Sequence, residues 1–426
     1  MDTIRLGSVG IIAWALSLSA CDSIPEGCDH YVRPGGDDRA NIQAAFIEAN
    51  DGDTVCLAAG TFTLVDPLEI RDRTNFTLRG MGPEQTVLDF SGQELGGTGI
   101  GMTNMTNVVV EDLGIVDAAG NGLRIEASEG VVIRRVHAGW TTPEDVTNGK
   151  YAIYPVSSTD VLVEDSLAYG SSDAGIYVGQ VTNCVVRNNT ARGNVAGIEI
   201  ENSQNCEVYG NTAEGNTGGI LVFELPGLPL QGAGTLVRDN VVRDNNVYNF
   251  AEEGSIVGAL PRGTGIFLLA ANDVEITGNT VTGNEGTGLA LISWGTAQAL
   301  GLGEATDPAY DPWAERIHVH DNTFGGNGTM PGGDGRDSSD PLLLVSALLA
   351  GAGVDVSAGL ETILWDGLVR GGDDPSDVLC IRANGDASFR NLDIANLAGG
   401  GTPQSTTDPS PHDCSFPSRP PVDLGG

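Results

Sequence analysis

The sequence predicts an all-β protein, a single-stranded parallel β-helix with a capping helix at its N-terminal end and an irregular cap at its C-terminal end. Residues 183–190 align with residues 205–212 at an offset of 22, and the same frame recurs at Val108, Val131, Val161, Thr235, Val274 and Ile317. A repeat of this length indicates coils that bury their apolar faces only against their neighbours. The 61 glycines among 426 residues suit the tight bends of such a chain.

Within one coil, the apolar residues alternate with polar ones. Val274 and Ile276 fall on one side, whereas Glu275 and Thr277 fall on the other, which indicates a short strand with one buried face. A second strand follows a Gly/Asn turn at residues 175–178, 197–200, 219–222 and 265–268. Short strands at a fixed spacing of one coil stack in parallel, so these segments predict the strand columns of a β-helix.

One asparagine recurs at the bend after the first strand of each coil. We expect these residues to form an inward ladder in which each side chain bonds the next coil; they are Asn189, Asn211, Asn240, Asn279 and Asn322. At the N-terminal end, Ile42, Ala45, Phe46 and Ala49 have helical spacing and predict an amphipathic capping helix over residues 38–50. Asp38 is its expected N-cap.

The charge of the chain excludes several classes of partner. Lys and Arg number 21 against 57 Asp and Glu, a net charge of −36. A chain this acidic repels phosphate backbones, so we expect no nucleic-acid partner. Unaided binding of a polyanion is disfavoured for the same reason.

The N-terminal residues have the features of an export signal. Arg5 precedes an apolar run from Leu6 to Leu18 that is too short to span a bilayer, and Leu18-Ser19-Ala20-Cys21 resembles a bacterial lipobox. We therefore predict a signal peptide over residues 1–20, lipidation of Cys21 and a tether over residues 21–36. The protein would be lipid-anchored in the bacterial cell envelope, periplasmic or surface-exposed. An ordinary signal peptide with a chance cysteine is the alternative.

Six further cysteines permit disulfides in an exported chain. We expect Cys28–Cys56 and Cys380–Cys414, each closing one end of a solenoid over residues 37–365; residues 366–426 would form the C-terminal cap and Pro-rich tail. Cys184 and Cys206 occupy the inward position of adjacent coils. Stacked strands lie about 4.8 Å apart, which permits a strained disulfide, but buried free thiols are the state we expect there.

The repeat also aligns the outward residues into columns. One column contains Arg124, Tyr154, Tyr177 and Glu199, and the next contains Glu126, Val156, Gly179 and Glu201. Later coils place apolar residues there, and the insertions at residues 224–234, 247–262 and 294–315 are expected to cover them, because an exposed apolar patch of that size would be a liability; these residues are Leu221, Phe223, Phe267 and Ile292. Together these residues predict a groove.

We interpret this groove as a polysaccharide site on a monomeric protein. Tyr154 and Tyr177 offer flat faces and hydroxyls to sugars, and the predicted substrate-binding residues are Arg124, Glu126, Lys150, Phe223 and Phe267. Two classes of protein fit: one that binds or processes an envelope or extracellular polysaccharide, and a non-enzymatic module that uses the β-helix as a rigid scaffold.

Two chemistries suit the predicted catalytic residues Glu199, Glu201, Tyr154 and Tyr177. The Cα atoms of Glu199 and Glu201 would lie about 6.6 Å apart, and inverting glycoside hydrolysis needs carboxyl groups roughly 6.5–9.5 Å apart. Glu199 would then be the acid and Glu201 the base. Alternatively, Tyr154 or Tyr177 would donate a proton in uronate elimination or epimerisation, with Arg124 or Lys150 neutralising the carboxylate. Binding without turnover and a merely solvated strand face are the remaining alternatives.

The interpretation of the groove as a polysaccharide site requires no metal or other cofactor. His318 and His320 lie on one outward face and could share a cation, but two surface histidines without that role are the expected state. Asp334, Asp337 and Asp340 have a spacing that permits calcium in a Gly-rich loop, although the loop is not an EF-hand. Calcium is therefore the only cofactor we keep as an alternative.

Several stretches of the sequence resemble two known families. Residues 42–62, with Ile42-Gln43-Ala44-Ala45-Phe46 and Gly52-Asp53-Thr54-Val55, resemble the start of pectate-lyase-like right-handed β-helix proteins. Residues 151–156, 172–180, 219–227 and 263–266 look like a bacterial family of parallel β-helix repeat-containing proteins, and this resemblance covers roughly residues 30–420. It implies a right-handed β-helix and no settled activity.

A more distant likeness is to mannuronan C5-epimerases, whose catalytic stretch reads Tyr-Gly-Ile-Asp-Pro-His-Asp. The matching stretch here is 151–157, where Tyr154, Val156 and Ser157 stand at the Asp, His and Asp positions. Because the proton-transferring residues are replaced, the resemblance does not imply epimerase activity for this chain.

Overall fold

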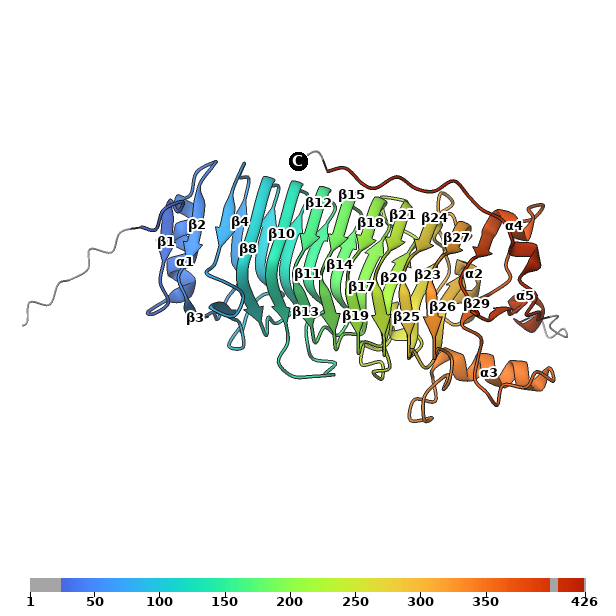
Figure 1. The fold of residues 1–426 in the computed structure, drawn as a ribbon. Coiled ribbons are helices and arrows are strands. Elements are labelled where there is room, and N and C mark those ends of the chain that lie inside the picture. Colours follow the sequence, from blue (N-terminus) through green and yellow to red (C-terminus); the bar gives the residue numbers. More distant parts are fainter. Residues whose placement is uncertain (1–23, 399–404, 425–426) are drawn as a thin grey trace, which may run out of the picture.

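The chain forms a parallel β-helix, as the repeat predicts (Figure 1). The computed structural model describes residues 24–398 and 405–424. The predicted signal peptide and Cys21 lie outside the described residues. Of the helices within these ranges, none has the length and apolar character needed to cross a bilayer.

Sheet A contributes two strand columns, both built from parallel pairs between neighbouring coils. Its first column consists of β1 (His30–Val32), β2 (Thr54–Leu57), β5 (Thr77–Arg79), β8 (Thr106–Val116), β10 (Glu129–Gly139), β12 (Thr159–Glu164), β15 (Thr182–Arg187), β18 (Gln204–Tyr209), β21 (Ala233–Arg238), β24 (Asn272–Thr277), β27 (Glu315–His320) and β30 (Leu379–Arg382). Its second column consists of β3 (Gly60–Thr63), β6 (Thr86–Asp89), the ends of β8 and β10, β13 (Leu167–Tyr169), β16 (Thr190–Arg192), β19 (Thr212–Glu214), β22 (Val241–Arg243), β25 (Thr280–Thr282) and β28 (Thr323–Gly325).

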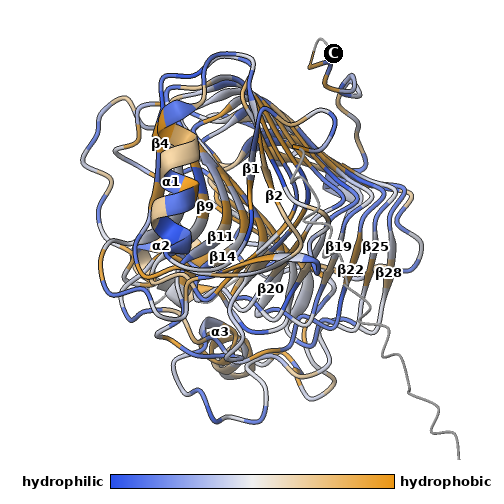
Figure 2. Ribbon diagram, turned by 90° about the vertical axis from the view of Figure 1, so that its left-hand side faces the viewer, coloured by the Kyte–Doolittle hydropathy of each residue, from blue (hydrophilic) through white to orange (hydrophobic). Residues whose placement is uncertain are grey.

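Sheet B is the third column, an 11-stranded parallel sheet. It consists of β4 (Leu68–Arg71), β7 (Thr98–Thr103), β9 (Asn121–Glu126), β11 (Tyr151–Val156), β14 (Ala174–Gly179), β17 (Ala196–Glu201), β20 (Gly218–Phe223), β23 (Thr264–Leu269), β26 (Thr287–Ile292), β29 (Ile363–Trp365) and β31 (Phe389–Asn391). Figure 2 looks along the solenoid and shows these columns in line. Val131, Val161, Cys184 and Cys206 stack in register and are fully buried, as the alternation predicts.

Helix α1 (Asp38–Glu48) is the predicted N-terminal cap, with Phe46 packed edge-on against Phe76. Its N-cap is Asp37 rather than the predicted Asp38, since the Asp37 carboxylate accepts from the Ala40 amide. Asp38 is buried and accepts instead from the Gly35 and Thr63 amides, so it fixes the helix to the first coil.

The remaining helices lie in the insertions and the C-terminal region. They are η1 (Val257–Ala259), α2 (Trp294–Ala299), α3 (Pro341–Gly351), α4 (Pro375–Val378), α5 (Ile394–Ala398) and η2 (Ser410–His412). Val257 in η1 and Trp294 in α2 pack with Leu221, Phe223 and Phe267 of sheet B. The insertions therefore cover the apolar coils, as expected.

All six cysteines within the described residues are paired. Cys28–Cys56 and Cys380–Cys414 match the predicted pairs at the two ends. The expectation of free thiols at Cys184 and Cys206 is wrong, because these residues form a third disulfide. Parallel register places them directly opposite each other in β15 and β18, with Cα atoms 4.4 Å apart, so no backbone shift is needed to join them.

The two ends of the solenoid recruit residues that the sequence assigned to the tether and the C-terminal cap. His30–Val32, within the predicted tether, pairs with β2 as strand β1. Beyond residue 365, β30 pairs with β27 and β31 pairs with β29, which continues both sheets. The tail after Cys414 then runs back along the solenoid (Figure 1), where the Val422 amide donates to Glu207.

Asparagine ladders bind the coils to one another at the corners. In the predicted ladder, Asn211 Oδ1 accepts from the backbone and side-chain amides of Asn189 at 2.9 and 3.0 Å, and the pattern continues through Asn240, Asn279 and Asn322 to Asn384. The preceding corner residues have positive φ, which suits Asn, Asp and Gly; they include Asn188, Gly210, Asp239, Gly278 and Asp321. A second ladder, unpredicted, runs through Asn194, Asn216, Asn245, Asn284 and Asn327.

We expect Asn240→Ala to lower the free energy of unfolding by about 2–5 kcal/mol, because it leaves buried amides of Asn211 without an acceptor. Urea denaturation followed by circular dichroism measures the change. The matched control is Asn41→Ala on the exposed face of α1, with an expected change within about 0.5 kcal/mol. Equal effects of the two substitutions would show that the ladder does not hold the coils together.

Candidate functional site

The outward columns predicted from the repeat are present on sheet B. Parallel register sets Arg124 opposite Tyr154, Tyr177 opposite Glu199, and Glu199 opposite Leu221. In the neighbouring column, Gly179 lies opposite Glu201, and Glu201 lies opposite Phe223. Residues from coils far apart in sequence therefore form one continuous stripe.

Three tyrosines cluster at the polar part of this stripe. The Tyr151 ring lies 4.6 Å from that of Tyr154 and 4.4 Å from that of Tyr177, and the last two meet edge-on at 5.0 Å. Tyr154 and Tyr177 were predicted site residues, whereas Tyr151 was not. Tyr151 is the first residue of β11, the strand that contains Tyr154, and its ring contacts the other two rings. The alternation of apolar and polar residues does not predict this contact.

Gly179 leaves the space through which the Tyr177 side chain reaches Glu201. The Tyr177 hydroxyl donates to Glu201 Oε1 at 2.5 Å, and the side chain is 4% exposed. A Cβ at Gly179 would lie 2.3 Å from Tyr177 Cε1, so only glycine leaves room for the ring. The residue pattern Tyr-Val-Gly in β14 thus builds the contact between two coils.

Four carboxyl groups in this part of the molecule are buried: Asp173, Glu199, Glu201 and Glu224. Burial raises the pKa of Asp173 to about 7, with Glu201 adding to the rise, while Lys150 and a hydrogen bond from Tyr151 oppose it. Burial likewise raises the pKa of Glu224 to about 8, although its Oε2 accepts from the Gly232 amide at 2.6 Å. Sequence reasoning missed both Asp173 and Glu224, because they lie just outside the alternating strands.

Glu199 and Glu201 lie near each other and are both buried. Burial raises the pKa of Glu199 well above its ordinary value, and the nearby Glu201 and Asp173 carboxylates raise it further. Glu201, whose pKa burial also raises, accepts from both Tyr177 and Glu199. Carboxyl groups in hydrogen-bond contact are closer than the roughly 6.5–9.5 Å of an inverting hydrolase. The structure therefore does not place Glu199 and Glu201 as a separated acid and base.

The cationic residues of the predicted site already have partners. Arg124 pairs with Glu126 at 2.6 Å and lies 5.8 Å from the centre of the Tyr154 ring. Lys150 pairs with Glu252 at 3.1 Å at the exposed edge. To neutralise a uronate, Arg124 would have to leave Glu126, and Lys150 would have to leave Glu252.

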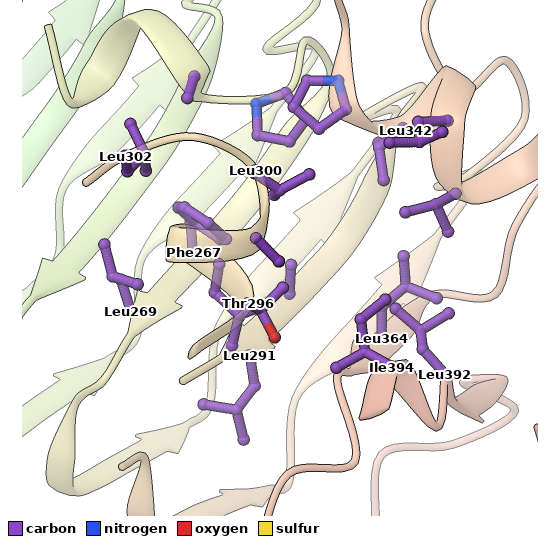
Figure 3. A pocket seen from close by; sticks show the side chains of 18 of the residues that line it. Phe267, Leu269, Leu291, Thr296, Leu300, Leu302, Leu342, Leu364, Leu392 and Ile394 are labelled. Carbon is purple, nitrogen blue, oxygen red and sulfur yellow. The ribbon is translucent and has the colours of Figure 1, made fainter. Parts of the chain in front are cut away.

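Phe223 and Phe267, predicted to bind substrate, line an apolar cavity of about 440 Å³ (Figure 3). Their rings meet edge-on at 5.5 Å, and Leu269, Leu291, Leu300, Leu342, Leu364 and Leu392 also line the space. Thr296 is the one polar residue in the lining, and its hydroxyl donates to Asp366. This cavity offers a sugar no free polar group, although Phe223 and Phe267 pack in the same apolar cluster as Tyr177.

The three aspartates considered for calcium do not converge. Asp340 caps α3 through the Leu342 amide, Asp334 accepts from Tyr248 and Arg336, and Asp337 accepts from Ser339. Among the described residues, the only group of three or more metal-ligating side chains with ligand atoms within 4.8 Å of one another is Glu275, His318 and His320. His318 is buried there, contrary to the expectation of two surface histidines.

A family model described as right handed beta helix region matches residues 74–227 and 144–301, which together exceed half of the chain. The chain belongs to this right-handed β-helix family. No curated protein matches it in sequence.

Solved structures of similar fold include three enzymes. The A-module of mannuronan C-5 epimerase AlgE4 from Azotobacter vinelandii is 16% identical, with a TM-score of 0.47, and 84% of this chain and 92% of that chain are covered. The catalytic unit of the GH87 alpha-1,3-glucanase from Streptomyces thermodiastaticus is 17% identical, with a TM-score of 0.44 and coverage of 73% and 62%. The polygalacturonase from Erwinia carotovora is 12% identical, with a TM-score of 0.45 and coverage of 72% and 96%.

The raised pKa of Glu224 makes stability depend on pH. A carboxyl group whose folded pKa is raised stabilises the fold fully below its unfolded pKa of about 4.5, and this contribution is lost as pH rises through about 8. We expect the difference in unfolding free energy between wild type and Glu224→Gln to fall by at least about 1.4 kcal/mol, the value of one pKa unit, between pH 5 and pH 8.5.

Urea titrations across that pH range measure this difference. The exposed Glu253→Gln variant is the control, and its difference from wild type should stay level. A Glu224→Gln difference that is also level would mean that Glu224 titrates normally.

Proposed function

We propose that this protein is exported to the cell envelope and binds a neutral saccharide at the tyrosine–acid cluster, which comprises Tyr151, Tyr154, Tyr177, Asp173, Glu199 and Glu201. The observation that carries the proposal is the triangle of three tyrosine rings, all within 5.0 Å of one another, near buried carboxyl groups. Aromatic faces contact the C–H faces of sugars, and hydroxyls bond their oxygens.

The charges favour a neutral sugar over a uronate. Arg124 and Lys150 are paired with Glu126 and Glu252, and the chain as a whole carries a net charge of −36. A polyanion would have to displace those carboxylates and overcome the general repulsion. A neutral polysaccharide has neither cost.

One observation favours turnover as a second candidate function. At neutral pH, Asp173, with its pKa raised to about 7, retains a proton in a substantial fraction of molecules. A general acid works best with a pKa near the operating pH, and perturbed carboxyl groups cluster at functional sites. Asp173 would then be the proton donor, with Glu201 and Tyr177 positioning the neighbouring ring. A non-enzymatic scaffold remains the competing function.

A glycan array followed by calorimetry on the mature chain tests the binding proposal. We expect a neutral oligosaccharide to bind and Tyr154→Ala to weaken binding by at least about 10-fold, or about 1.4 kcal/mol. Tyr209→Ala on sheet A is the matched control and should leave the affinity unchanged. Absence of binding to every neutral glycan, or equal losses in the two variants, would favour the scaffold function.

Export and anchoring have a separate test. The three disulfides are consistent with an oxidising compartment, and the proposed anchor is the lipid on Cys21. We expect labelled palmitate to enter the wild-type protein and Cys21→Ser to abolish both labelling and sedimentation with membranes. Unchanged sedimentation of Cys21→Ser would remove the lipid anchor from the account.

A further inference from the structure

Two histidines and a glutamate form a cluster on the outward face of sheet A, away from the tyrosine–acid cluster. Register between β24 and β27 sets Glu275 directly opposite His318, and His320 follows two residues later on the same face. The two imidazole rings lie 4.1 Å apart at an angle of 32°. Such close stacking brings ring nitrogens from two side chains to the same carboxylate.

Among the residues that the structure describes, none is a hydrogen-bond partner of the His318 ring. His318 is 5% exposed, and neither Nδ1 nor Nε2 has a partner in the structure. Buried polar groups are nearly always satisfied, and an unpaired one is costly. A ligand that accepts a nitrogen lone pair would remove this cost.

The other two side chains are each held from outside by one atom, and their remaining atoms, His320 Nε2 and Glu275 Oε1, pair with each other where an ion would bind. His320 pairs through Nδ1 with Asp321 at 2.7 Å, and its Nε2 lies 2.9 Å from Glu275 Oε1. Glu275 Oε2 accepts from the Arg419 amide at 2.5 Å. A carboxylate on the far nitrogen of a histidine is the usual way in which a metal-binding imidazole is oriented.

The C-terminal tail closes over the cluster. Cys380, opposite His318 in the next coil, is joined to Cys414, which holds the tail at this position. From there the Phe416 ring meets His318 edge-on, and the Arg419 guanidinium pairs with Asp273 at 2.6 Å. The cluster is therefore shielded by a segment that the solenoid itself anchors.

We infer that Glu275, His318 and His320 bind one divalent transition-metal ion such as Zn²⁺. Their ligand atoms all lie within 4.8 Å of one another, and bond lengths of about 2.1 Å around a tetrahedral ion require separations of about 3.4 Å. Small side-chain rotations therefore close the site. Two imidazoles and one carboxylate suit zinc and its neighbours, whereas calcium and magnesium prefer oxygen ligands.

The bound ion would join the tail to the solenoid. Glu275 is the residue that contacts both the ion and the Arg419 amide, so the metal and the tail stabilise each other's position. A fourth position on the ion remains for water. The site thus differs in ligand and in location from the saccharide site proposed above.

Titration of the chelator-treated full chain with ZnCl₂ by calorimetry tests the inference, with CoCl₂ absorption as an independent probe of coordination. We expect one ion per chain and a melting temperature that Zn²⁺ raises and EDTA lowers again. His318→Ala and His320→Gln should each weaken binding by more than about 100-fold, and Asp321→Asn by about 10–100-fold.

His137→Gln, a half-buried histidine of β10 outside the cluster, is the matched control and should bind Zn²⁺ as wild type does. Circular dichroism of each variant without metal separates loss of the site from loss of the fold, and the exposed Asp321→Asn keeps the test decisive if His318→Ala does not fold. The inference is overturned if the wild-type chain takes up no stoichiometric Zn²⁺ or Co²⁺, or if His320→Gln and Asp321→Asn bind as well as His137→Gln.

Discussion

In-register parallel stacking of neighbouring coils is the constraint on which the rest of this structure depends. It sets each residue of one coil against the corresponding residue of the next, so inward positions form apolar columns and corner asparagines form continuous ladders. The same rule acts on the outward face, where nothing requires apolar residues. Side chains far apart in sequence, such as Tyr177 and Glu199 or Glu275 and His318, become neighbours there, and chemistry can be assembled from several coils.

Two side-chain clusters of this kind, one on each sheet, differ in how the non-repeating segments cover them. On sheet B, the tyrosine rings lie near carboxyl groups whose pKa is raised by burial, and the insertions pack against the apolar coils that follow. On sheet A, the tail covers Glu275, His318 and His320 and satisfies one oxygen of the glutamate, but it offers no partner to His318. The solenoid sets the positions of these side chains. The non-repeating segments determine which of the side chains are shielded from water.

The repeat frame was sufficient to predict what the period controls. It placed Tyr177 next to Glu199, identified the ladder from Asn189 onward, and located the insertions over Phe267. It could not reveal that Asp173 and Glu224 join the buried acids, or that the tail covers His318, because those contacts depend on segments without a period. The prediction of free thiols at Cys184 and Cys206 is wrong for a different reason: burial favours a free thiol, but the in-register approach of the two strands brings the cysteines close enough to join.

The most direct test of the saccharide site is a crystal structure of the mature chain soaked with the neutral oligosaccharide that binds best. The account predicts a sugar ring stacked on Tyr154 or Tyr151, with a hydroxyl within hydrogen-bond distance of the Asp173 or Glu201 carboxyl group. An oligosaccharide bound only on another face, without contact to any of the three tyrosines, would contradict it.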